Sequence, residues 1–363
     1  MTLLENLRAN RLILGIANVG FWVVCSAIIL VGRSNLESTI ASISPVWIWL
    51  IALTGYTLAQ GIFDWIGSTN SHNKRETNPS VAIQWIRGVA LQTVVWASIS
   101  ALIVLASHLG AGYCFACLSG ILLLCTSQLI FLKWINGGTF TTTTENTDFA
   151  GKTFFINCSE ATFTGGTVVG IKNEQIVPLG WRENEALKIE SLRRNYAVEK
   201  GLPVRTLLIL IAWNLVGVAI GDWLKFFDSG NMALTVIYFS AWMTLWSFIG
   251  LLILPSLSHS SVYAADRASY QKKPKKTEDF INKFPDIVGE NGHNNPRIQK
   301  IFFPIPNSKA RLEKLNETSC SKLVLGSLSR TNLFLSWACL NLTARSVHCN
   351  IGRPLLWIYP PAA

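Results

Sequence analysis

Histidine spacing is the first test of whether this chain could hold a catalytic metal. Its five histidines are His72, His108, His259, His293 and His348. No two of them stand three or four residues apart, so no single helical turn can present two imidazoles to one metal ion. A zinc site could still assemble by folding from His259, His293, His348 and Cys349. We keep this set as an alternative hypothesis, in which the protein is a membrane-embedded metal-dependent hydrolase with a nonstandard site.

A second candidate for chemistry is the pair Cys114 and Cys117, which forms an isolated CxxC. Thiols one helical turn apart can be redox-active or can supply half of a metal site. Without a second pair or a nearby histidine, the simpler interpretation is that both are small residues packed between helices. We therefore expect no cofactor.

A membrane carrier for small molecules or ions would need polar residues inside its apolar membrane-spanning stretches. Those stretches contain Asn18, Gln60, Gln92, Gln128 and Asn214, with Asp64 and Asp222 near their ends. Hydrogen bonding between helices explains most of these residues. An ion-coupled carrier would need a carboxylate deep in the bilayer, and the sequence places none there. A small-molecule carrier is kept as a second alternative.

The elements that would position these residues are membrane helices. Half of the 363 residues are hydrophobic and 14% are charged, whereas soluble domains have about 25% charged residues. A helix needs about 20 apolar residues to cross the bilayer. Six stretches meet or approach that length, at 12–32, 44–64, 86–107, 113–132, 206–224 and 232–254. The sequence predicts a mainly α, multi-pass membrane protein.

The basic residues predict the orientation of these helices. All of the 31 Lys and Arg except Arg33 and Lys225 fall in alternate extramembrane pieces, when Arg87 at the start of the third span is counted with the loop before it. By the positive-inside rule, both termini are expected in the cytoplasm, in a cell's inner (cytoplasmic) membrane. A basic cluster suited to anionic lipid headgroups follows the last span and comprises Lys272, Lys273, Lys275 and Lys276. No module typical of nucleic-acid binding accompanies this cluster.

The chain between and after the spans predicts smaller elements. We expect transmembrane helices over 1–135 and 205–254, a β insert with an amphipathic helix over 136–204, and a helical cytoplasmic region over 255–363. Short β-prone stretches around Gly165-Gly166 predict an antiparallel sheet with a hairpin turn at these glycines. The helix is expected over 184–200, lying along the membrane surface, with Glu190 and Arg194 as an i,i+4 pair.

Two parts of the tail have distinct predicted roles. Residues 333–343 are apolar but too short to span, so they are expected in the interface or packed on the membrane helices. Residues 352–361 combine Arg353, Trp357 and Tyr359 with several prolines. We interpret them as an exposed segment suited to a partner's groove, with packing on its own domain as the alternative.

One region is similar to a known family. Residues 258–268 read SHSSVYAADRA, which resembles the third-ligand region SRxxExxADxxA of HtpX-like membrane zinc metallopeptidases. Residues 303–315, FPIPNSKARLEKL, resemble the family's later Pro-containing stretch and basic helix. The resemblance implies a transmembrane scaffold with a helical domain at the cytoplasmic face. It does not imply activity, because the HExxH signature is missing and Val262 stands at the third-ligand position.

The sequence thus favours a degenerate, non-catalytic relative of these peptidases. We expect a membrane scaffold, assembly factor or accessory subunit, with membrane lipids and protein subunits as its partners. Two structural contacts are predicted in the resembling regions. Asp266 and Arg267 should form a buried polar contact, and Arg311 with Glu313 should lie on the helix that follows.

Overall fold

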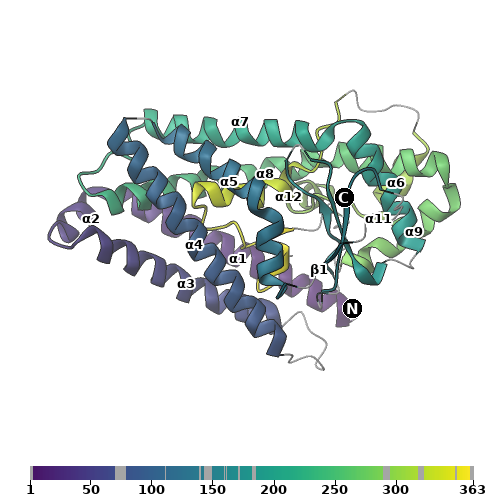
Figure 1. Cartoon of the computed structure of the whole chain (residues 1–363), viewed down its shortest axis with the longest axis horizontal. Helices are drawn as coiled ribbons and strands as arrows, with labels where there is room; N and C mark the ends of the chain where they lie inside the picture. The colour runs from purple at the N-terminus through teal and green to yellow at the C-terminus, as the bar shows by residue number, and fades with distance from the viewer. Residues whose placement is uncertain are drawn as a thin grey trace. The chain divides into compact units, whose positions relative to one another are not determined.

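The computed structural model describes residues 3–69, 79–110, 112–138, 140–142, 149–158, 160, 162–170, 172–181, 185–288, 295–317, 323–347 and 350–359 (Figure 1). The chain divides into two compact units. Unit 1 comprises Met1–Ser127, Ile211–Ile249 and Leu333–Trp357. Unit 2 comprises Gln128–Leu210, Gly250–Asn332 and Ile358–Ala363. The last 109 residues are thus shared between the units, rather than forming the single region 255–363 expected from the sequence.

Six helices in the described part of the chain are long and apolar enough to cross a membrane. They are α1 (Leu3–Val31), α3 (Pro45–Thr69), α4 (Pro79–Leu109), α5 (Tyr113–Ile135), α7 (Leu202–Trp223) and α8 (Met232–Lys272). A short helix, α2 (Arg33–Ile40), links α1 to α3, which pack against each other. The six predicted spans are confirmed, and the chain is a mainly α, multi-pass membrane protein.

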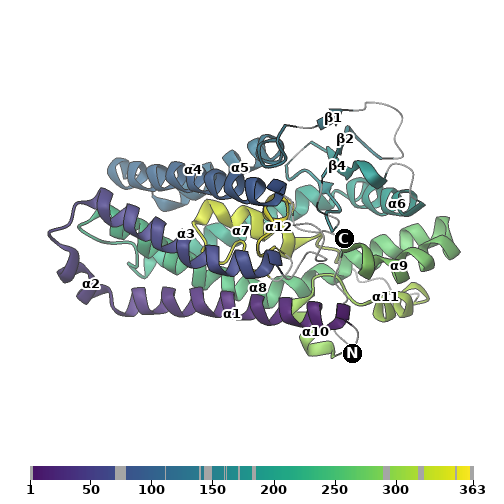
Figure 2. The ribbon, with the colours of Figure 1, turned by 90° about the horizontal axis from the view of Figure 1, so that it is seen from below.

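Unit 1 encloses the apolar part of the tail, drawn in yellow in Figure 2. The end of α12 (Leu328–Leu335) and the 3-10 turn η2 (Ser336–Cys339) are buried among apolar helices. The Sγ atoms of Cys117 and Cys339 lie 3.5 Å apart, and the Ser240 hydroxyl donates to the Leu340 carbonyl over 2.6 Å. The prediction that 333–343 packs on the membrane helices is therefore confirmed.

Unit 2 contains a four-stranded sheet of order β1-β2-β4-β3. Its strands are β1 (Phe140–Thr142), β2 (Thr153–Ile156), β3 (Gly166–Thr167) and β4 (Gln175–Pro178). The outer pairs are antiparallel, whereas β2 and β4 are parallel. The predicted hairpin at Gly165-Gly166 does not form, because Gly166 pairs with Ile176 inside the sheet. The chain instead reverses before β4, where Val168 N–H donates to the Glu174 carbonyl over 2.8 Å.

The helices of unit 2 gather around a second apolar core. They are α6 (Glu185–Glu199), α9 (Pro274–Val288), α10 (Pro296–Phe302) and α11 (Ser308–Leu315), with the end of α8. Helix α9 buries Phe280, Ile281, Phe284 and Val288 on one face, a spacing that puts apolar side chains on one side of a helix. This face packs with Ile189 of α6 and Val262 of α8 in one apolar cluster. The cluster therefore joins residues of α6, α8 and α9, and α6 packs directly against α9.

Candidate functional site

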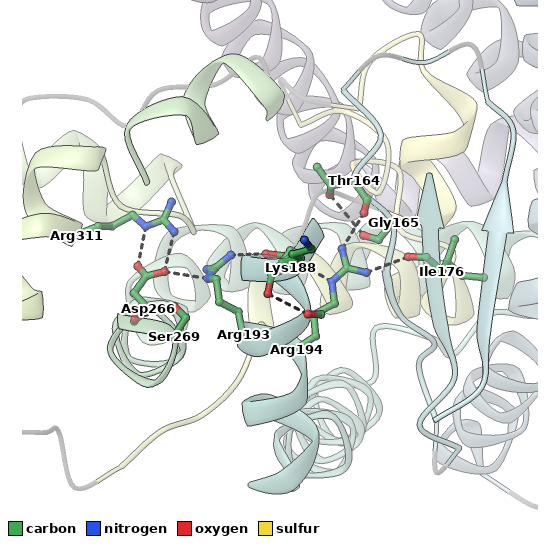
Figure 3. Close-up of polar contacts among 11 residues, drawn as sticks. Thr164, Gly165, Ile176, Lys188, Arg193, Arg194, Asp266, Ser269 and Arg311 are labelled. Carbon is green, nitrogen blue, oxygen red and sulfur yellow. Dashed lines mark hydrogen bonds and ion pairs between the residues drawn. The ribbon is translucent and has the colours of Figure 1, made fainter. Parts of the chain in front are cut away.

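Five charged side chains form a continuous buried network in unit 2 (Figure 3). We call it the ion network; it consists of Glu190, Arg193 and Arg194 of α6, Asp266 of α8 and Arg311 of α11. None of the five is more than 6% exposed. Charged side chains are almost never buried to this extent unless they are paired. The network is thus the largest concentration of buried charge that the described part of the chain contains.

Asp266 is the centre of the network's first half. It accepts two parallel hydrogen bonds from Arg311, from Nε and from Nη2, each 2.8 Å long. The Nε atom of Arg193 lies 2.9 Å from its Oδ1. Bidentate guanidinium–carboxylate contacts of this kind are among the stronger polar contacts in proteins. Asp266 therefore joins three helices that are distant in the sequence.

Glu190 is the centre of the second half. Its two carboxylate oxygens accept from Arg193 Nη1 over 2.7 Å and from Arg194 Nε over 2.8 Å. Arg194 also donates to the carbonyls of Thr164 and Ile176, over 2.8 and 2.9 Å (Figure 3). The predicted i,i+4 pair of Glu190 and Arg194 is confirmed. The polar face of α6 that carries this pair is buried within unit 2.

The electrostatics of the network hold its carboxylates in the ionised form. Burial alone would raise the pKa of Glu190, but Arg193 and Arg194 outweigh burial and hold this pKa below its usual range. Burial would lower the pKa of Arg193, and Asp266 with Glu190 raises it instead. Since Glu190 is ionised and already accepts two charged hydrogen bonds, it is poorly suited to take a proton from a water molecule.

Acid should destabilise unit 2 through Glu190. Its folded pKa lies below the value of about 4.3 in the unfolded chain, so its contribution to stability is present above that value and is lost as pH falls through the folded pKa. We expect the thermal unfolding midpoint of the chain in detergent to fall between roughly pH 5 and pH 2. A Glu190→Gln variant should be less stable at neutral pH and should lose less on acidification. An unchanged pH slope in this variant would contradict the assignment.

A small cavity of about 100 Å³ borders the network. It is lined by Glu190, Arg193 and Arg194 together with hydroxyl groups, among them those of Thr206 and Ser261. Its volume suits a few water-sized groups and not the side chains of a peptide substrate, since small-molecule pockets usually have at least about 300 Å³. The arrangement can therefore anchor helices firmly, but it offers little room for a macromolecular substrate.

The two predicted contacts of the resembling regions have different outcomes. Asp266 is buried as expected, but its partners are Arg311 and Arg193. Arg267 faces elsewhere and donates from Nη2 to the Lys314 carbonyl over 3.1 Å. Arg311 lies on α11, which Asn307 caps by accepting from the Ala310 N–H over 2.8 Å, whereas Glu313 on the same helix is exposed.

Three of the four residues of the alternative metal site lie outside the part of the chain that the structure describes. His259 is buried, and its Nε2 lies 2.7 Å from the Phe303 carbonyl oxygen. His293, His348 and Cys349 lie outside the described residues. Among the described residues, no group of three or more His, Cys, Asp and Glu side chains is arranged to hold a metal ion.

The tail segment predicted to dock into a partner is buried. Arg353 is 6% exposed, Trp357 is fully buried and Tyr359 is 4% exposed. The Trp357 indole donates to the Asn350 carbonyl over 2.7 Å, and the Tyr359 ring packs against Phe163. The interpretation as an exposed docking segment is wrong, and the alternative, packing on its own domain, is confirmed, because the aromatic side chains that suggested a partner fill the protein's own core. Of the basic cluster, Lys272, Lys275 and Lys276 are exposed and Lys273 is half-buried.

Unit 1 contains a buried ion pair that the sequence did not reveal. Asp64 of α3 lies 3.5 Å from Arg345 of the tail, and both are buried. Asp64 also accepts from Gln60, from the Trp85 indole and from the Gly352 N–H, over 3.0 to 3.2 Å. From the apolar residues around it, Asp64 could be placed only near the end of a span. Its ion pair could not be predicted, because Arg345 lies far away in the sequence.

Charge spacing within α6 is the one signal by which sequence reasoning could have found the ion network. Glu190 stands three and four residues before Arg193 and Arg194, so all three share one helix face. Sequence alone cannot show that this face of α6 is buried against Asp266.

No protein-family model matches the chain, and no curated protein or solved structure matches it either.

Proposed function

We propose that this protein is a non-catalytic membrane scaffold, assembly factor or accessory subunit, and that unit 2 is a metallopeptidase-like site whose metal has been replaced by an arginine. The observation that carries the proposal is the position of Arg193. Its guanidinium lies between the carboxylates of Glu190 and Asp266, at 2.7 and 2.9 Å. A cation is thus held between α6 and α8, and it is part of the chain itself.

The resemblance of residues 258–268 to HtpX-like peptidases allows the position of Arg193 to be compared with that of the zinc ligands in this family. In the HtpX-like peptidases, the third zinc ligand stands where this chain has Val262, and the HExxH helix supplies the other two ligands and the base. Helix α6 reaches this part of α8 through Arg193, which pairs with Asp266 four residues after Val262, and Ile189 belongs to the same apolar cluster as Val262. Residues Ile189, Glu190 and Arg193 have the His, Glu and His spacing of the signature.

The substitutions at these positions argue against hydrolysis. A catalytic zinc needs three protein ligands and a base that activates water. Isoleucine and valine cannot bind a metal, and the arginine is a cation itself. The remaining glutamate, Glu190, is engaged by two guanidinium groups. The residues therefore support a structural role for the site, in which Arg193 performs the bridging that a metal would otherwise provide.

The proposed placement follows the distribution of charge. We place the protein in a cytoplasmic membrane, with both termini and unit 2 on the cytoplasmic side, where its basic pieces gather. The exposed lysines at the end of α8 and the start of α9 then face anionic lipid headgroups. A scaffold of this kind would present its surface to other membrane proteins while the ion network keeps unit 2 rigid.

The scaffold role is tested on the chain in its native membrane. After extraction in mild detergent, we expect it to migrate on native gels in a defined complex larger than the 40.1 kDa chain. Partners should be retained in constant stoichiometry through two purification steps. A chain that runs alone at native abundance, or that cleaves a membrane-protein substrate in purified form, would overturn the proposal.

The proposed geometry also predicts a gain of metal binding. In the triple variant Ile189→His, Arg193→His and Val262→Glu, three ligands should face one another, and the remaining Asp266–Arg311 pair stays balanced in charge. We expect about one zinc per chain by elemental analysis and a thermal unfolding midpoint that falls when a chelator is added. The single variant Ile189→His is the matched control and should bind no zinc. A folded triple variant without zinc would show that the three positions do not converge.

A further inference from the structure

Unit 1 brings together three cysteines that the proposed function does not use. Cys114 and Cys117 lie in the first two turns of α5, and Cys339 ends the 3-10 turn η2 of the tail. The Sγ atoms of Cys117 and Cys339 lie 3.5 Å apart, and both side chains are fully buried. The isolated CxxC of the sequence therefore has a third thiol beside it, from a segment 222 residues further along the chain.

The backbones next to these thiols approach each other closely. A Cβ atom added at Gly120, one turn after Cys117, would lie 3.1 Å from the Cβ and 3.4 Å from the Cα of Ala338. Ala338 directly precedes Cys339. A disulfide requires Cβ atoms about 3.5–4.5 Å apart and Cα atoms about 4.4–6.8 Å apart. The close approach of α5 and η2 therefore allows a disulfide between Cys117 and Cys339 without a large movement of either element.

The Cys339 thiol is held in position by its turn. Leu340, the next residue, has a left-handed backbone with a φ of 51°, which is costly for a residue other than glycine and persists where the surroundings enforce it. The Ser240 hydroxyl donates to the Leu340 carbonyl over 2.6 Å, and the Cys339 thiol donates to Asn214 Oδ1 over 3.5 Å. These contacts keep the Cys339 sulfur beside Cys117, so little freedom is lost when the two sulfurs bond.

Cys114 is the member of this cluster that a reagent can reach. Fully buried cysteines are inert towards reagents in solution, and Cys117 and Cys339 belong to this class. Cys114 is half-buried and is the second residue of α5, at one end of a helix long enough to span the membrane. It lies one helical turn before Cys117, on the same side of α5. An external reagent therefore meets Cys114 first.

The proposed orientation of the protein places this end of α5 on the outer side of the membrane. The loop between α4 and α5 contains no Lys or Arg, as expected for an outer loop. Disulfides form and persist outside the cytoplasm, where the surroundings are oxidising. Cys114 would thus face the compartment that supplies an oxidant.

We propose that these three cysteines form a thiol–disulfide relay, which ends in a reversible disulfide between Cys117 and Cys339 and so ties the tail to α5. The oxidant is a small organic disulfide, RSSR. The proposal concerns unit 1 alone and is independent of the proposed scaffold function.

The relay consists of three exchange steps. The Cys114 sulfur attacks RSSR, which forms a mixed disulfide and releases one RSH. Cys117 attacks the Cys114 sulfur, which forms the Cys114–Cys117 disulfide and releases the second RSH. Cys339 then attacks the Cys117 sulfur, which forms the Cys117–Cys339 disulfide and returns Cys114 to the thiol. In each step the attacking sulfur loses a proton and the released sulfur gains one, so that two protein thiols are oxidised and RSSR is reduced to two RSH.

The test uses the full chain, reduced and purified in mild detergent, with glutathione disulfide as the probe at mildly alkaline pH. The reaction is stopped by acid, free thiols are alkylated, and the peptides are mapped by mass spectrometry without reduction. We expect a linked pair of peptides joined through Cys117 and Cys339, with two hydrogen atoms lost per chain. Dithiothreitol should restore both thiols.

Two variants and one control separate the relay from direct oxidation of the buried pair. Cys117→Ser should stop the reaction at the first step, with glutathione bound to Cys114. Cys114→Ser should slow formation of the Cys117–Cys339 disulfide by at least about tenfold, because the thiol that the probe can reach is gone. Cys125→Ser is the matched control, since Cys125 is a half-buried cysteine on the same helix, and it should change neither the product nor its rate.

Three results would overturn the proposal. They are the absence of the Cys117–Cys339 pair at excess glutathione disulfide, an unchanged rate in Cys114→Ser, and a disulfide at these cysteines that joins two chains on a non-reducing gel. If Cys117→Ser fails to fold, the peptide map of the unchanged chain and the rate in Cys114→Ser still decide the outcome.

Discussion

Replacing Asp266 with Asn is expected to lower the free energy of unfolding of the chain by about 3–5 kcal/mol. The substitution removes the negative charge shared by Arg193 and Arg311, whose guanidinium groups are both buried. Breaking one partner out of a buried ion pair costs far more than the pair itself contributes, because it leaves an unpaired charge in the interior. Unfolding can be followed by circular dichroism during a denaturant titration in detergent.

A matched control for this variant lies on the helix that carries Arg311. Glu313 is an acidic residue two positions from Arg311 on α11, and it is exposed. Glu313→Gln should leave the unfolding free energy nearly unchanged. The double variant Asp266→Asn with Arg311→Gln should lose less than the sum of its single variants, since the two side chains are coupled. Equal losses in Asp266→Asn and Glu313→Gln would show that the ion network does not hold unit 2 together.

Replacing Trp357 with Ala should lower the free energy of unfolding by a similar amount, about 3–5 kcal/mol. Trp357 is fully buried in unit 1, and the Arg345 guanidinium lies 4.4 Å from its ring centroid. Helix α4 approaches it so closely that a Cβ added at Gly88 would lie 2.7 Å from the ring. The substitution leaves a large cavity and removes the aromatic surface against which Arg345 is packed.

The control for Trp357 is a tryptophan in a different environment. Trp47 at the start of α3 is 63% exposed, so Trp47→Ala should change the unfolding free energy little in detergent. Both variants can be compared by the loss of tertiary fluorescence signal during unfolding. A Trp357→Ala protein as stable as the Trp47→Ala protein would restore the interpretation of the tail as an exposed docking segment.

The spans were predictable because their signal is local. Each of the six helices is a run of apolar residues long enough to cross a membrane, and such a run can be read without knowing its neighbours. The strands β2 and β4 were predictable for the same reason. The parallel pairing between them was not, since it depends on which strands meet after the chain has crossed over, and no residue in either strand determines that.

Only part of the ion network could be predicted from the sequence. Asp266 and Arg311 were singled out because the resembling regions contain them, and the bidentate contact between them was not foreseen. The polar face of α6 resembles a solvated face in sequence, since buried and exposed charge patterns on a helix look alike. In the folded chain Ile189 joins the apolar cluster around Phe284, and Arg193 on the polar face pairs with the buried Asp266.

The tail was misinterpreted for a related reason. Prolines and aromatic residues near a terminus are typical of segments that dock into partners, and also of segments that complete a core. Asp64 was placed near a span end, yet it is buried and paired with Arg345. In both cases the deciding partner lies far away in the sequence, where no periodicity links the two residues.

In the proposed scaffold, the cation between α6 and α8 is the guanidinium of Arg193 and not a metal ion. This assignment is tested most directly by the zinc content of the full chain, purified in mild detergent without chelator and measured by elemental mass spectrometry. We predict well under one zinc per chain, with no change in the His259→Ala variant. One zinc per chain that is lost in His259→Ala would contradict the account and would favour a hydrolase with a nonstandard metal site.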